Sequence, residues 1–177
     1  QMCIRDSISF LVEGAVMDWS GVLLTEVKNM DIALAGTGYA IFSVAMLIMR
    51  LLGDKTVQFL GEQKAVIGGS IVTAAGFALV VVLDNLYLNA FAFILIGLGC
   101  ANIVPVFYSL LKYQKGMPIS AAVTSVTSLG YTGVILGPAL LGFVAHGINI
   151  STVFELVALL LVIEAGIAKY VFCKLKM

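Results

Sequence analysis

Residues Leu86–Leu111 read LYLNAFAFILIGLGCANIVPVFYSLL and contain no Asp, Glu, Lys or Arg. An α-helix rises ~1.5 Å per residue and the hydrocarbon core of a bilayer is ~30 Å thick, so roughly 20 apolar residues cross it. This stretch is long enough to do so. Because lipid offers no hydrogen bonds to a backbone, such a stretch must pair its own amides and carbonyls as a helix.

Stretches of similar length and composition fill most of the chain. The 177 residues are 61% hydrophobic and 11% charged, with a mean hydropathy of +1.10, whereas a soluble domain carries about a quarter charged residues. We therefore predict an all-α, polytopic membrane protein in which residues 8–177 form a single transmembrane domain. The predicted spans are Ile8–Val27, Ile32–Leu52, Val66–Leu83, Leu86–Leu111, Ile119–Val144 and Val153–Phe172.

The composition excludes several function classes. Net charge is zero, so nothing favours nucleic acid as a partner. His146 is the single histidine, and the three cysteines (Cys3, Cys100 and Cys173) show no pairing pattern. We therefore predict no metal, no disulfide and no cofactor. The sequence has no H-E-x-x-H motif and no identifiable pair of nucleophile and base, so an intramembrane enzyme is the least favoured interpretation.

The first seven residues, QMCIRDS, look like the translated read-through of a sequencing adapter. Residues 1–7 are therefore predicted to be non-native and to lie outside the transmembrane domain. On that interpretation the genuine chain begins near Ile8, already inside a helix. The alternative is an ordinary polar N-terminus.

The basic residues predict the orientation. Six crossings put both termini on one side, and most Lys and Arg residues fall at that face, with Lys28 at the other. By the positive-inside rule, both termini and the loops Gly53–Ala65 and Lys112–Pro118 are cytoplasmic, in a cell inner or plasma membrane. The basic residues at the predicted cytoplasmic face are Arg50, Lys55, Lys64, Lys112, Lys115, Lys169, Lys174 and Lys176.

Two carboxylates lie inside the first span. Asp18 is nine positions and Glu13 fourteen positions before Val27, which places them roughly 14 Å and 21 Å from that end of the helix. A carboxylate at such depth costs several kcal/mol and is a functional hypothesis by default. We interpret Glu13 and Asp18 as candidates for proton coupling; the alternative is that neighbouring helices satisfy both for structural reasons.

Polar stripes on other spans indicate a cavity. Hydroxyls spaced four, three and four residues apart share one face of the fifth span, and the second span repeats the pattern more weakly. Water-filled cavities and helix–helix hydrogen bonds both produce such stripes. Trp19 either stacks on a solute or fills a helix contact, and Arg50 either belongs to the stripe or snorkels to the interface. The cavity candidates are Trp19, Tyr39, Ser43, Asn102, Ser120, Thr124, Thr127 and Tyr131.

Other residues suggest bends and close packing. Pro105 follows Asn102 at mid-depth in the fourth span, where irregular backbone is tolerated if it is buried or lines a cavity. Gly133 and Gly137 form a G-x-x-x-G with Pro138 beside it, a pattern typical of helix packing and hinges.

The loop after the second span resembles a known motif. Arg50-Leu-Leu-Gly53-Asp54-Lys55, then Gly61 and Lys64, is similar to the cytoplasmic loop motif of the major facilitator superfamily, although Glu62 and Gln63 stand where arginines are common. The segments 13–20 and 129–138 resemble the seventh and eleventh helices of its fucose-permease-like sugar and drug transporter branch.

The resemblance implies a C-terminal six-helix half of a twelve-helix transporter, built as two inverted three-helix repeats, Ile8–Leu83 and Leu86–Phe172. Its first, second, fourth and fifth helices would line the cavity. The third and sixth would support it. The expected partners are the lipid bilayer, a small-molecule solute and a missing N-terminal half.

The function we predict is secondary active transport of a small polar solute, sugar-like or drug-like, by alternating access with proton coupling. The alternative is a non-transporting membrane scaffold or sensor on the same fold, which would keep the glycine contacts without needing a polar cavity.

Overall fold

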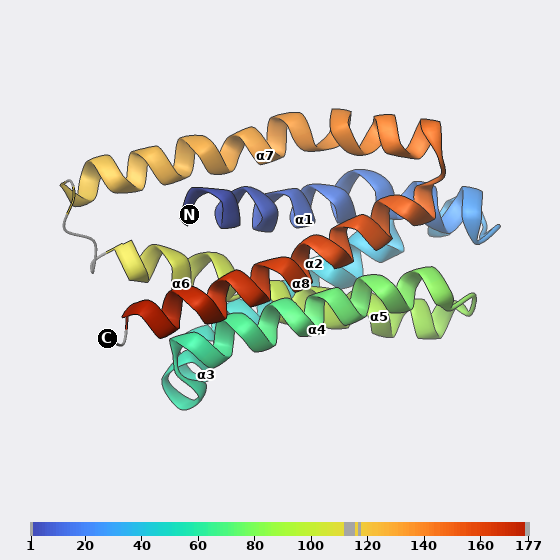
Figure 1. The fold of residues 1–177 in the computed structure, drawn as a ribbon. Helices are drawn as coiled ribbons and strands as arrows, with labels where there is room; N and C mark the ends of the chain where they lie inside the picture. The colour runs from blue at the N-terminus through green and yellow to red at the C-terminus, as the bar shows by residue number, and fades with distance from the viewer. Residues whose placement is uncertain (1, 112–115, 117, 176–177) are drawn as a thin grey trace.

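The computed structural model describes residues 2–111, 116 and 118–175, and these fold into a bundle of helices (Figure 1). In chain order the elements are α1 (Met2–Val22), η1 (Leu23–Val27), η2 (Ile32–Leu34), α2 (Thr37–Leu51), α3 (Gly53–Leu60), α4 (Glu62–Val82), α5 (Leu86–Cys100), α6 (Ile103–Leu110), α7 (Ile119–Gly147) and α8 (Ile150–Leu175).

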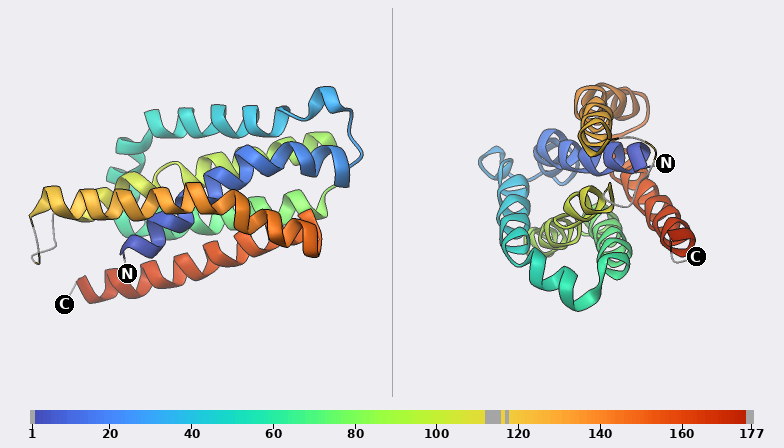
Figure 2. Two further views of the ribbon diagram at one scale, coloured as in Figure 1. Left: turned by 90° about the horizontal axis from the view of Figure 1, so that it is seen from above. Right: turned by 90° about the vertical axis from the view of Figure 1, so that its left-hand side faces the viewer.

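The all-α fold class and the six spans are confirmed within the described residues. Helices long and apolar enough to cross a membrane cover Ile8–Val27, Ile32–Leu51, Glu62–Val82, Leu86–Leu110, Ile119–Gly147 and Ile150–Tyr170. Figure 1 and the left view of Figure 2 place both chain ends at the same end of the bundle. Helix α1 includes residues 2–7. A helical backbone does not reveal whether these residues are native, so their non-native origin stays a prediction.

Several boundaries differ from the prediction because helical hydrogen bonding continues into polar residues that a hydropathy pattern does not count. The third span begins at Glu62 rather than Val66. The fifth continues to Gly147 and the sixth begins at Ile150. The segment Gly53–Ala65, predicted as a loop, contains α3 and the first turn of α4. Gly61, at φ 81°, separates these two helices. Of the predicted loop Lys112–Pro118, residues 112–115 and 117 lie outside the described residues.

The fourth span consists of two helices, and the break lies at the irregular backbone that Asn102 and Pro105 led us to expect. Helix α5 ends at Cys100, and α6 begins at Ile103 after a turn at Ala101 and Asn102. Pro105 has no N–H, so the carbonyl of Ala101, four residues earlier, lacks its helical partner. The proline therefore accounts for the break, which falls beside the buried Asn102.

Helix α5 packs between two neighbours, and the remaining helices follow from that arrangement. It lies along α2 on one side and α4 on the other; α8 packs on α4, and α1 packs on α7. The view along the bundle in Figure 2 shows α1 and α7 together on one side, opposite α4. Phe77 of α4 and Phe154 of α8 are fully buried, with ring centroids 5.5 Å apart.

Glycines permit the close packing of α5. A Cβ placed on Gly97 would lie 2.5 Å from the carbonyl oxygen of Phe42 in α2. A Cβ on Gly69 of α4 would lie 2.5 Å from the carbonyl oxygen of Gly99. The predicted packing glycine Gly137 makes a looser contact, because its Cβ would lie 3.8 Å from Leu11. Among the described glycines, the closest approaches to the backbone of a neighbouring helix therefore involve α5.

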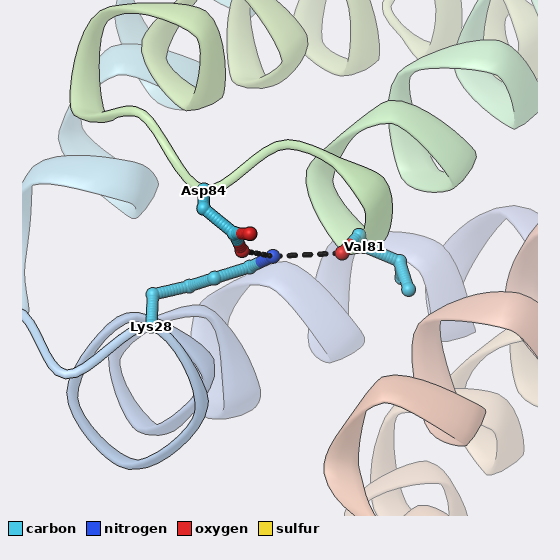
Figure 3. Close-up of polar contacts among 3 residues, drawn as sticks. All are labelled: Lys28, Val81 and Asp84. Carbon is cyan, nitrogen blue, oxygen red and sulfur yellow. Dashed lines mark hydrogen bonds and ion pairs between the residues drawn. The ribbon is translucent and has the colours of Figure 1, made fainter.

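An ion pair ties the opposite end of the bundle together (Figure 3). Lys28, whose side chain is 2% exposed, donates from Nζ to Oδ1 of Asp84 at 2.8 Å and to the carbonyl oxygen of Val81 at 2.7 Å. The turn after α1 is thereby joined to the end of α4, where a cation near the helix C-terminus is favourable. The described basic residue at this end is thus paired rather than free.

We expect Gly69→Ala to destabilise the protein by about 1–3 kcal/mol, because the added methyl group meets the Gly99 carbonyl. Gly68→Ala is the matched control, since a Cβ there meets nothing within 4 Å, and it should change stability by no more than about 1 kcal/mol. Thermal unfolding of both variants in detergent measures the difference. Equal stability of the two variants would contradict the close approach of α4 and α5.

Candidate functional site

A cleft of about 360 Å³ opens between α1, α2 and α7. It brings together Glu13, Tyr39 and Ser43, which the sequence analysis had singled out on two different spans. On α2, Tyr39, Ser43, Leu47 and Arg50 recur every three or four residues and so share one helical face. The lining residues are Phe10, Glu13, Gly14, Met17, Tyr39, Ser43, Met46, Leu47, Arg50 and Val134.

An ion pair lies in this cleft. Arg50 donates from Nη2 to Oε1 of Glu13 at 2.8 Å, and the side chains are 46% and 29% exposed. Arg50 had two interpretations in the sequence, a member of the polar stripe on the second span or a side chain that snorkels to the interface. The structure adds a direct partner for it on α1. Pairing offsets much of what either charge would cost within a membrane span.

An aromatic pair borders the cleft. The rings of Phe10 on α1 and Tyr131 on α7 stack with centroids 5.7 Å apart and planes inclined by 19°. Phe10 lines the cleft, whereas Tyr131 is exposed and is not among the described lining residues. Stacked rings of this kind add to the contact between α1 and α7.

The hydroxyls of α7 do not all turn toward one cavity. Thr127 shares a hydrogen bond of 2.8 Å with the Tyr108 hydroxyl of α6, which joins two helices. Thr124 donates to the carbonyl oxygen of Ser120 in its own helix, and both residues are exposed. None of these three lines the cleft, and their predicted contact with a solute stays a prediction.

The remaining candidates lie elsewhere. Trp19 faces α7, where a Cβ on Gly142 would lie 3.4 Å from its ring, so it fills a helix contact. Asp18 is exposed on α1 and does not line the cleft. Asn102 is buried beneath Gly53, where any Cβ would collide with its Oδ1. That collision gives a physical reason for the glycine of the loop motif.

The rest of the loop motif lies at the surface. Asp54 and Lys55 are exposed on α3, and Lys64 is exposed on the first turn of α4. Of the other basic residues used to predict orientation, Lys169 is exposed on α8. Lys112, Lys115 and Lys176 lie outside the described residues, as does the side chain of Lys174.

Sequence reasoning did not identify the partner of a third membrane carboxylate. Glu164 of α8 is fully buried, and its Oε1 accepts a hydrogen bond of 3.3 Å from the Ser9 hydroxyl of α1. This bond links the two terminal spans. In the part of the chain that the structure describes, no three His, Cys, Asp or Glu side chains gather to hold a metal ion.

Comparisons with known proteins agree on a transporter fold. The chain is 40% identical over 164 residues to an uncharacterized MFS-type transporter of Yersinia pestis, covering 93% of this chain and 43% of that protein. It is 31% identical to the uncharacterized transporter y4wD of Sinorhizobium fredii and 25% identical to the membrane protein MosC of Rhizobium meliloti, covering 42% and 39% of their lengths. No family model matches the chain.

A solved structure supports the same architecture. The crystal structure of the POT family transporter PepTSo superposes with a TM-score of 0.71 at 14% identity, covering 96% of this chain and 37% of that one. The chain thus has the fold of a six-span part of an MFS transporter, and it spans about two fifths of the length of the curated relatives that it matches.

A double-mutant cycle tests the ion pair. We expect Glu13→Gln and Arg50→Gln each to destabilise the protein, because each leaves the other charge without its partner. The double variant should lose less unfolding free energy than the two single variants lose together, with a coupling energy of about 1–3 kcal/mol. Unfolding free energies of the four proteins in one detergent give this value. Additive losses would mean that the two side chains do not interact.

Proposed function

We propose that this chain is the C-terminal half of a secondary transporter of the major facilitator superfamily, from its fucose-permease-like branch. It moves a small polar solute, sugar-like or drug-like, across a cell inner or plasma membrane by alternating access coupled to protons. The Glu13–Arg50 pair in the cleft between α1, α2 and α7 is the observation that carries this proposal.

The composition of the cleft supports a solute site. Tyr39 and Ser43 offer hydroxyls beside the ion pair, while Phe10, Met17 and Met46 give apolar surface. Ligand sites commonly combine a mostly apolar wall with a few convergent polar groups. A second six-helix half, the expected partner, would complete the cleft.

The ion pair supports proton coupling. When Glu13 is ionised, its charge and that of Arg50 cancel. When Glu13 is protonated, no other carboxylate among the described lining residues is there to pair with Arg50. Since an unpaired charge is costly in a membrane protein, the protonation of Glu13 favours a rearrangement around Arg50 or the arrival of another partner. A proton can shift an equilibrium between two conformations only if it is bound more favourably in one of them than in the other. The loss of the Glu13–Arg50 pair on protonation supplies such a difference.

The distribution of basic residues supports an orientation with both termini in the cytoplasm. Arg50, Lys55, Lys64 and Lys169 lie toward the end of the bundle that holds both chain ends, opposite the paired Lys28. Excess Lys and Arg is typical of cytoplasmic loops.

A chimera tests the transport function. The matched 164 residues of the Yersinia pestis transporter are replaced by this chain, and the chimera is reconstituted in liposomes. Solutes that raise its melting temperature are then assayed for uptake with a pH-sensitive dye in the lumen. We expect a solute gradient to move protons. A folded chimera that binds and carries no solute, beside an active parent protein, would favour the scaffold or sensor.

Two amide variants of the chimera separate the carboxylates. Glu13→Gln should abolish solute-driven proton movement while exchange of labelled for unlabelled solute continues, because exchange needs no net proton transfer. Asp18→Asn is the matched control and should keep both activities, since Asp18 does not line the cleft. Proton movement that survives Glu13→Gln and stops in Asp18→Asn would transfer the coupling role to Asp18.

A further inference from the structure

Two clefts lie end to end along α5. One, of about 260 Å³, is bounded by α2, α3, α4 and α5; the other, of about 520 Å³, lies between α2 and α5. Leu98 lines both, so they form one surface, which we name the α5 groove. The first cleft is lined by Met49, Thr56, Leu60, Lys64, Ala65, Gly68, Gly69, Val72, Leu98, Gly99 and Asn102, and the second by Ala40, Ile41, Val44, Ala45, Ile48, Ile94 and Leu98.

The second cleft is wholly apolar. Its described lining consists of alanine, valine, isoleucine and leucine side chains. Along α2, the groove extends from Met49 to Ala40, nine residues or ~13 Å of helix. Both residues lie within a candidate membrane span. An apolar groove of this length in hydrocarbon fits an acyl chain and offers no hydrogen bond to a polar solute.

The first cleft has a cationic end. Among its described lining residues only Lys64 carries a charge, and the hydroxyl of Thr56 and the amide of Asn102 accompany it. The nearby acids do not line it: Asp54 is exposed on α3, and Glu62 accepts a hydrogen bond of 2.9 Å from Ser109 of α6. An anionic group at this end would therefore meet an ammonium group without an opposing carboxylate in the lining.

Helix α3 marks the membrane boundary beside the cationic end. Phe59 is 89% exposed and Leu60 is also exposed, whereas Asp54, Lys55 and Gln58 supply a polar, exposed side. Short amphipathic segments with this pattern lie in the interface, with the apolar residues in the lipid. The groove thus runs from headgroup level, at Lys64, into the hydrocarbon, at Ile94.

We propose that the α5 groove binds a phospholipid with an anionic headgroup. The phosphate lies beside Lys64, and one acyl chain follows the channel between α2 and α5. Charge complementarity and the match between a polar end and an apolar channel commit the groove to this occupant. The site is separate from the Glu13–Arg50 cleft, because Ala40, Val44 and Ile48 lie on a different face of α2 from Tyr39 and Ser43.

The headgroup contact is tested by native mass spectrometry of the purified chain titrated with dioleoylphosphatidylglycerol. We expect one lipid to bind, with dioleoylphosphatidylcholine binding more weakly. Lys64→Gln should weaken binding of phosphatidylglycerol about fivefold, the effect of one basic residue near an anionic lipid surface. Lys55→Gln is the matched control: it removes an exposed charge on α3 outside the groove lining and should leave binding unchanged.

A second pair of variants tests the acyl-chain channel. Val44, 57% exposed, lines the groove, and Val44→Trp should fill it and abolish tight binding of phosphatidylglycerol. Val162 of α8 is 55% exposed and lies outside the groove lining, so Val162→Trp should bind as the parent chain does. Circular dichroism confirms that each variant compared is folded.

Four outcomes would overturn the proposal. Equal losses in Lys64→Gln and Lys55→Gln would indicate diffuse attraction, and equal binding of phosphatidylcholine would remove the anionic preference. If glycerol phosphate displaced phosphatidylglycerol at an equal concentration, the site would recognise the phosphate group alone rather than a lipid. Binding to this chain but not to the chimera with the Yersinia pestis N-terminal part would mean that a second half covers the groove.

Discussion

The close approach of α5 to both α2 and α4 is the contact on which the rest of the bundle depends. In hydrocarbon there is no water to drive helices together, so they associate through close packing and interhelical hydrogen bonds. Gly97 lets α5 meet the backbone of α2, and Gly99 lets it meet α4. Because α2 is fixed in this way, one of its faces lines the cleft with Glu13, and another lines the α5 groove.

Charges within and beside the spans mark where helices are held to one another. Arg50 joins α2 to Glu13 of α1, Lys28 joins the turn after α1 to the end of α4, and Ser9 joins α1 to Glu164 of α8. Helix α1 provides Glu13 and Ser9 for two of these links, and Lys28 of the third lies in the turn that follows α1. Its apolar residues Val12, Ala15 and Val16 are also buried in the main core, so polar links and apolar packing together attach α1 to the bundle.

The sequence alone predicted the membrane environment and the number of spans, because these depend on the composition and length of each segment. It did not predict the partner of Arg50 or the orientation of the α7 hydroxyls. A helical period shows which residues share a face, but the rotation of one helix against another decides what that face meets. Thr127 therefore proved to bond to Tyr108, and Trp19 to pack on Gly142.

The same limit applies to glycine. The G-x-x-x-G of Gly133 and Gly137 is the more recognisable pattern, yet the closest described approaches to the backbone of a neighbouring helix are at Gly69, Gly97 and Gly99. Spacing reports only that two small residues share a face, whereas a close approach also requires a partner backbone opposite that face. Pro105 was more informative, because a missing N–H disrupts its own helix whatever lies beside it.

The end of α2 brings these features together. Arg50 extends from its last turn into the cleft to reach Glu13, and three residues later Gly53 begins α3 directly over Asn102 at the break between α5 and α6. A larger residue at position 53 would collide with the Asn102 side chain, so either that side chain or α3 would have to move, and both border the cationic end of the α5 groove. The loop motif, the broken span and the ion pair are therefore parts of one packed corner, and a shift of Arg50 must be accommodated within it.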